Sequence, residues 1–150
     1  MINYYKTEHF ELYELVPEDI YEKYKAMGKL HILLGCFDPR MLWTLDRLRE
    51  RSGPMIMNDW YWGGRNRYRG WRPPGCKIGA DLSMHRFGGA GDLVPANTTA
   101  ERVRQDILAD PFCEDFQYIT CIEMDVQWLH FDTRNWDKAE AGILRIYPRN

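Results

Sequence analysis

The sequence predicts a single α+β domain in which an antiparallel sheet is covered by helices on one face. Its 150 residues are the usual size of one domain with a buried core. Two segments, 38–54 and 98–111, carry the start and stop signals of helices. The last third has two alternating segments on either side of a short linker, which is typical of a β-hairpin.

The N-terminal 28 residues predict a strand followed by a helix. Residues 10–15 (FELYEL) alternate apolar and polar side chains, as a half-buried strand does. The next segment begins with Pro17 and acidic residues and ends at Gly28. Proline in the first turn and glycine after the last turn are the usual boundaries of a helix.

The segment FDPRMLWTLDRLRERSGP carries a full set of helix signals. Asp38 can cap the first free amides, and Pro39 occupies the first helical position. The apolar stripe consists of Leu42, Leu45 and Leu48. We expect this helix to end at Gly53 and Pro54.

Residues 55–60 (MIMNDW) predict a buried strand that enters a long loop. From residue 63 to residue 79 the chain is rich in glycine, proline, arginine and aromatic residues. Loops longer than about 12 to 15 residues in a compact domain are usually functional or disordered. The arginine and aromatic content argues against disorder, so we expect this loop to have a function.

A further helix and a hairpin are predicted in the C-terminal half. Thr98 and Glu101 have the spacing of a capping box, and apolar residues follow on one helical face before Pro111. Two strands are predicted at 116–124 and 128–136, around the linker Asp125, Val126 and Gln127.

The composition argues against several classes of function. The formal net charge is -2, so a nucleic-acid binder using the arginine and aromatic residues of RNRYRGWRPP ranks last, and no nucleic-acid partner is expected. The longest apolar run falls far short of the roughly 20 residues that span a bilayer, so no membrane insertion is expected. The N-terminus lacks the features of a signal peptide, which predicts synthesis in the cytoplasm. The four cysteines form no CxxC pair, so we expect reduced thiols.

Three residues in two distant segments have the chemistry of a metal site. His85 and Asp92 lie in the glycine-rich segment SMHRFGGAGDL, and His130 lies in the alternating segment QWLHFDTR. On that strand, Trp128, His130, Asp132 and Arg134 share one face. Two imidazoles and a carboxylate suit zinc, and three protein ligands leave one coordination position open, as in catalytic sites.

The runs RGWRPPG, SMHRFGGAGDL and WLHFD resemble the motif series of the zinc D-alanyl-D-alanine carboxypeptidase superfamily, which shares its fold with the hedgehog signalling domain. The matching positions are Gly70, Trp71, Arg72, Ser83, His85, Gly88, Ala90 and Asp92. The resemblance covers about residues 37–134. It implies a zinc site of His85, Asp92 and His130, and a phage or prophage protein.

The resemblance also implies a role for Arg72, whose planar guanidinium matches a substrate carboxylate. A surface arginine in a polar loop is the other interpretation. Asp132 is interpreted either as a partner that holds a metal ligand or Arg72, or as one half of a salt bridge at the strand end.

The chain departs from the family at Gln127, where many members have the acid that accepts a proton from the attacking water. An amide cannot do this near neutral pH, and two explanations are open. In the first, Glu123 on the neighbouring strand is the general base. A two-residue turn at 125–126 would place the Glu123 side chain diagonally next to His130, whereas a three-residue turn would point this side chain away from the site. In the second, the site binds zinc without efficient hydrolysis.

The resemblance therefore implies a zinc peptidase that cleaves peptidoglycan peptides as a carboxypeptidase or endopeptidase, similar to an endolysin. The catalytic residue would be Glu123, the substrate would be bound by Arg72, and zinc would be the cofactor. We expect it to act at the bacterial cell wall or as part of a phage particle, with other virion proteins as further partners. The alternative is an inactive structural or wall-binding phage protein that keeps the fold and the metal.

Overall fold

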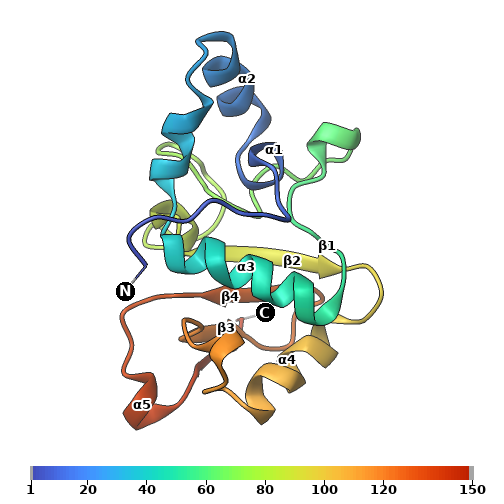
Figure 1. The fold of residues 1–150 in the computed structure, drawn as a ribbon, viewed down its shortest axis with the longest axis vertical. Coiled ribbons are helices and arrows are strands. Elements are labelled where there is room, and N and C mark those ends of the chain that lie inside the picture. The colour runs from blue at the N-terminus through green and yellow to red at the C-terminus, as the bar shows by residue number, and fades with distance from the viewer. Residues whose placement is uncertain (1, 149–150) are drawn as a thin grey trace.

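In the part of the chain that the structure describes, the sheet has five strands in the order β1-β2-β4-β3-β5. The computed structural model describes residues 2–148 (Figure 1). The strands are β1 (Met55–Ile56), β2 (Ala90–Pro95), β3 (Cys121–Glu123), β4 (Leu129–Asp132) and β5 (Leu144–Ile146). The predicted antiparallel pairing is confirmed for the first four strands in this order. The pairing of β5 with β3 is parallel, so the sheet as a whole is mixed.

Within residues 2–148 the chain also forms five α-helices. They are α1 (Leu12–Leu15), α2 (Glu18–Ala26), α3 (Pro39–Ser52), α4 (Ala100–Ala109) and α5 (Lys138–Ala141). Four 3-10 turns join them, at Leu30–Cys36, Trp60–Trp62, Met84–Phe87 and Glu114–Phe116. Figure 1 shows α3 running across the sheet, with α1 and α2 at the opposite end of the molecule from α4 and α5. The chain is thus an α+β domain, as predicted.

The helix predicted at 38–54 is confirmed in detail. The Asp38 carboxylate accepts a hydrogen bond from the Arg40 amide, Pro39 begins α3, and Gly53 follows its end with a positive φ of 84°. In α4 the helix begins one residue later than predicted. Its cap is Thr99, whose hydroxyl accepts from the Arg102 amide at 3.1 Å, so the predicted capping box does not form.

The strand predicted at residues 10–15 is wrong, because this segment contains α1. The amide of Glu11 donates to the Glu14 carboxylate at 2.8 Å, and the Glu14 amide donates to the Glu11 carbonyl at 2.9 Å. Such reciprocal bonds close a helical turn at its first residues. The apolar residues of this short segment also fit one helical turn, so their alternation did not distinguish the two structures.

The core lies on one face of the sheet, beneath α3. A Cβ on Gly91 would lie 3.5 Å from a methyl carbon of Leu45 in α3, so this face of β2 packs on the helix. Successive strand residues alternate between faces, so Asp92 points to the opposite face. The helix α4 also contacts β2 and β4, and its buried Val103 and Ile107 belong to the same core. The predicted arrangement, with helices on the face away from the metal residues, is therefore confirmed for α3.

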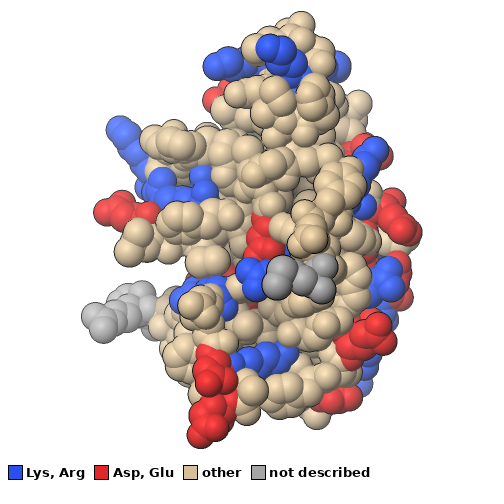
Figure 2. Space-filling view, turned by 60° about the vertical axis from the view of Figure 1, so that its left-hand side comes forward, with Lys and Arg blue, Asp and Glu red and all other residues tan. Residues whose placement is uncertain are grey.

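Three further predictions can be compared with the described residues. Residues 63–83 contain no helix or strand, so the predicted long loop is confirmed. The four cysteines form no disulfide. No helix within 2–148 is both long and apolar enough to span a bilayer. Figure 2 shows one face of the molecule, on which basic side chains lie interspersed with acidic ones.

Candidate metal centre

A tight turn brings the first two predicted ligands together. Ser83 caps the 3-10 turn Met84–Phe87, where its hydroxyl accepts from the His85 amide. Gly88 ends this turn with a φ of 67°, and a Cβ there would overlap the carbonyl oxygen of Cys36. Only glycine meets both demands without strain. The chain then enters β2, which carries Asp92.

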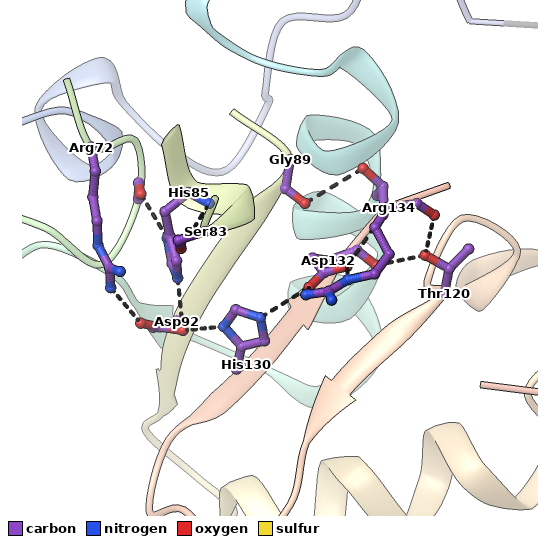
Figure 3. A network of polar contacts seen from close by, with 11 residues as sticks. Arg72, Ser83, His85, Gly89, Asp92, Thr120, His130, Asp132 and Arg134 are labelled. Carbon is purple, nitrogen blue, oxygen red and sulfur yellow. Dashed lines mark hydrogen bonds and ion pairs between the residues drawn. The ribbon is translucent and has the colours of Figure 1, made fainter. Parts of the chain in front are cut away.

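The sheet register brings in the third predicted ligand. Asp92 of β2 and His130 of β4 are direct partners in the antiparallel ladder, so their side chains project from the same face. The His130 Nδ1 atom lies 2.7 Å from Asp92 Oδ1, and His85 Nε2 lies 3.2 Å from the same oxygen (Figure 3). All three residues are buried, with exposed fractions of 1 to 8%. The structure therefore joins the three residues predicted from the sequence.

The donor set fits a metal ion. One ligand atom from each residue lies within 4.8 Å of the others. Tetrahedral zinc with bonds of about 2.0 to 2.2 Å places neighbouring ligand atoms about 3.3 Å apart, close to the observed His85–Asp92 distance. The Nδ1 atom of His85 lies 2.8 Å from the Gly70 carbonyl oxygen. Because a carbonyl only accepts, Nδ1 carries the proton, and Nε2 keeps its lone pair for a metal.

The electrostatics of the site couple these groups. Burial alone would raise the pKa of Asp92, but hydrogen bonds from His130 and His85 outweigh it and hold this pKa well below its usual value. Burial alone would lower the pKa of His130, but hydrogen bonds to Asp132 and Asp92 raise it to about 9. Without a metal, a proton thus bridges the site, and a cation must displace it.

Arg72 lies at the edge of the same site. Its Nη2 atom is 3.4 Å from Asp92 Oδ2, and its Nε donates to the Tyr68 carbonyl at 2.8 Å. Its Nη1 atom lies against Gly79, where a Cβ would overlap it. Among residues 2–148, no acceptor is bonded to Nη1. The arginine is therefore held in place by two contacts and keeps one terminal nitrogen for a further partner.

Glu123 also faces the site, although neither of the two turns considered from the sequence forms. Cys121 pairs with Asp132 and Ile122 with Phe131, so the strands are joined by five residues, 124–128. Relative to the expected register the shift is two residues, which keeps Glu123 on the His130 face. Within the described part of the chain, its carboxylate makes no hydrogen bond or ion pair. Gln127 lies exposed in the connection.

These side chains line one pocket of about 400 Å³. Its wall includes Arg72, His85, Asp92, Glu123 and His130, with apolar contributions from Leu82, Trp128 and Ile146. The pocket therefore combines a possible metal site, an unpaired carboxylate and a guanidinium, which is a set suited to hydrolysis of a polar substrate.

Two contacts of the site were not predicted from the sequence. The first is the Gly70 carbonyl that orients His85; it is a backbone atom 15 residues away in the chain, so no side-chain pattern marks it. The second is the full set of partners of Asp132. This residue contacts His130 Nε2 at 3.2 Å and also forms an ion pair with Arg134 at 2.6 Å, so the salt bridge at the strand end is present together with a contact to a candidate ligand.

No family model, curated protein or solved structure matches this chain. Its functional assignment therefore depends on the geometry of the site.

Proposed function

We propose that this chain is a zinc-dependent peptidase of the D-alanyl-D-alanine carboxypeptidase and hedgehog type, which cleaves peptidoglycan peptides as a carboxypeptidase or endopeptidase. The observation that carries the proposal is the meeting of buried His85, Asp92 and His130 at a pocket that Glu123 and Arg72 also line. Two imidazoles and one carboxylate favour zinc over magnesium or calcium, which prefer oxygen ligands. When bound, zinc lowers the pKa of a water molecule and polarises the peptide carbonyl.

Glu123 is the proposed general base. It lines the pocket together with the metal residues, and its carboxylate has no partner among residues 2–148. It would accept a proton from the attacking water and return it to the leaving amine. The exposed Gln127 is not among the pocket residues, so it does not compete for this role.

Arg72 is the proposed substrate anchor. Its contacts with Tyr68 and Asp92 fix the guanidinium at the pocket wall. The free Nη1 atom, together with the weakly held Nη2, can donate to a carboxylate of the peptide. Such an anchor would place the scissile bond near Glu123 and would favour peptides that end in a free carboxylate.

Digestion of purified peptidoglycan by zinc-loaded protein tests this proposal. Mass spectrometry should detect new peptide termini, and a chelator should abolish them. Glu123→Gln should lower the rate by about 10²- to 10⁴-fold, because it removes the proton acceptor but keeps the shape. The matched control is Glu140→Gln, the same change at an exposed residue of α5. The absence of new termini with zinc-loaded wild type would reject the peptidase.

Gln127 favours a second candidate, a wall-binding or virion protein that keeps the fold and metal without efficient hydrolysis. This protein would sediment with insoluble peptidoglycan and release no fragments. The Glu123→Gln variant would then bind as wild type does, since the carboxylate would have no catalytic task. The same digest therefore distinguishes the two candidates, with the phage particle or the bacterial wall as the site of action in both.

A further inference from the structure

Asp132 lies behind the metal site, on the far side of His130. The two residues share one face of β4, and Asp132 Oδ2 lies 3.2 Å from His130 Nε2 (Figure 3). The other ring nitrogen, Nδ1, faces Asp92. The imidazole of His130 is thus held between two carboxylates, one in the metal site and one outside it.

Asp132 is fully buried and is surrounded by donors. Arg134 supplies three of them: its backbone amide at 3.2 Å and Nε at 2.8 Å reach Oδ1, and Nη2 at 2.6 Å reaches Oδ2. An ionised carboxylate only accepts hydrogen bonds. The remaining partner, His130 Nε2, must therefore donate. In a neutral imidazole this leaves the lone pair on Nδ1, the atom that faces Asp92.

We propose that Asp132 is a positioning residue of the metal site, which fixes His130 in the tautomer that presents Nδ1 to the metal, and that Arg134 clamps Asp132 for this task. The inference rests on the proposed zinc site. Carboxylates that accept the outer proton of a ligand histidine fix its ring and raise its basicity.

The two histidines of the site are then oriented by different means. His85 is held at Nδ1 by the Gly70 carbonyl and presents Nε2. His130 is held at Nε2 by a side chain and presents Nδ1. Replacing the side chain of Asp132 removes the group that orients His130. The Gly70 carbonyl is a backbone atom and remains in place, so the orientation of His85 is unchanged. A substitution of Asp132 can therefore test the support of His130 alone.

The test measures zinc affinity by competition with a chromophoric chelator. Asp132→Asn keeps the volume but leaves one acceptor oxygen for four donors, so its amide nitrogen must face a donor. We expect zinc affinity to fall by about 10- to 100-fold. The visible absorption of the cobalt-substituted protein should change as well, because the geometry of His130 at the metal changes.

The matched control is Asp115→Asn, since Asp115 also pairs with an arginine, Arg51 at 3.0 Å, but is only partly buried and is absent from the metal group. Its zinc affinity should equal that of wild type. Arg134→Gln is the second variant. It alters a partly exposed side chain, so it tests the clamp even if Asp132→Asn does not fold, and we expect a loss of up to about tenfold.

A folded Asp132→Asn protein with wild-type zinc affinity and cobalt spectrum would overturn the inference. If that variant does not fold, unchanged affinity in Arg134→Gln would overturn it. The role of Asp132 and the proposed peptidase activity can fail independently of each other. Wild type that binds zinc but releases no peptides would reject only the peptidase, whereas wild type without zinc affinity would reject both.

Discussion

Gly88 connects the turn that holds His85 to the strand that holds Asp92. Its φ of 67° lies in the left-handed region, and a Cβ would overlap the Cys36 carbonyl. Gly28 has nearly the same φ, 66°, but a Cβ there would meet no atom within 4 Å. The two glycines thus share a backbone conformation and differ in the space around them.

This pair separates backbone strain from steric overlap. Gly28→Ala should lower the free energy of unfolding by about 1 to 2 kcal/mol, the cost of a left-handed alanine. Gly88→Ala should lower the free energy of unfolding by more than Gly28→Ala does, because the overlap with Cys36 adds to the backbone strain. It should also weaken zinc binding, because Asp92 would shift. Urea denaturation and zinc titration of both variants measure this. If the two variants lost the same free energy of unfolding, the turn at Gly88 would accommodate a Cβ without displacing Cys36.

The residues of the metal site could be predicted, but their supports could not. His85, Asp92 and His130 are side chains of distinctive chemistry, and their segments resemble a known motif series. The atoms that orient them include the Gly70 carbonyl and the donors around Asp132. Backbone atoms carry no residue-specific signal, and a carboxylate two positions from a histidine fits a salt bridge equally well.

At the scale of elements, α2 and α3 were predicted correctly, whereas α1 was predicted as a strand and the connection between β3 and β4 was predicted too short. The turns of two or three residues that the sequence left open depended only on local pairing. In the structure, Arg104 of α4 donates to the carbonyls of Val126 at 2.6 Å and Trp128 at 2.7 Å. These contacts hold a five-residue connection in place. A residue more than 20 positions away thus determines its shape, which local sequence cannot predict.

Replacing Arg104 tests this support. Its guanidinium is buried, with an exposed fraction of 3%, and makes charged hydrogen bonds to both carbonyls. Arg104→Met keeps much of the aliphatic chain and removes the hydrogen-bond donors. The free energy of unfolding should therefore fall by about 1.5 to 3 kcal/mol. Hydrogen exchange of amides 124–128 should also accelerate more than that of α3. Unchanged exchange in this connection would show that it is stable without Arg104.

Asp38 links α3 to Thr133, the residue that follows β4. Its carboxylate caps the helix through the Arg40 amide at 2.9 Å and accepts the Thr133 hydroxyl at 2.7 Å. Burial alone would raise the pKa of Asp38, but the hydrogen bonds from Arg40 and Thr133 outweigh it and lower this pKa. A carboxyl group with a lowered pKa in the folded state adds stability above its unfolded pKa, about 3.9, and loses it as the pH falls through the folded value.

Asp38→Asn isolates this charge, since asparagine is also a good helix cap. At pH 7 the variant should be less stable than wild type by about 1 kcal/mol, the scale of a charged hydrogen bond. The difference should shrink as the pH falls below about 4, because the unfolded wild type then binds a proton that the folded carboxylate does not yet bind. Urea denaturation at pH 7 and pH 3 measures it. A difference that is the same at both pH values would assign the effect to shape instead of charge.

At the scale of the whole molecule, the metal site and the core lie on opposite faces of the sheet. Leu93, Leu129 and Phe131 belong to the core, whereas their strand neighbours Asp92 and His130 belong to the group that could hold a metal. Without a cation, ion pairs between Asp92 and the two histidines satisfy the buried charges. We therefore expect the metal-free chain to fold, unlike small domains that need zinc to form a core.

Zinc should still stabilise the fold, because it binds residues from two segments that separate on unfolding. At a free zinc concentration of about 100 times Kd, the gain is about 2.7 kcal/mol, which raises the Tm of a domain of this size by about 5 to 11 °C. Calorimetry with zinc and then with a chelator measures the shift. His130→Ala should abolish it, whereas His31→Ala, at an exposed position outside the site, should retain it. An equal zinc-dependent shift in both variants would place the bound metal elsewhere on the molecule.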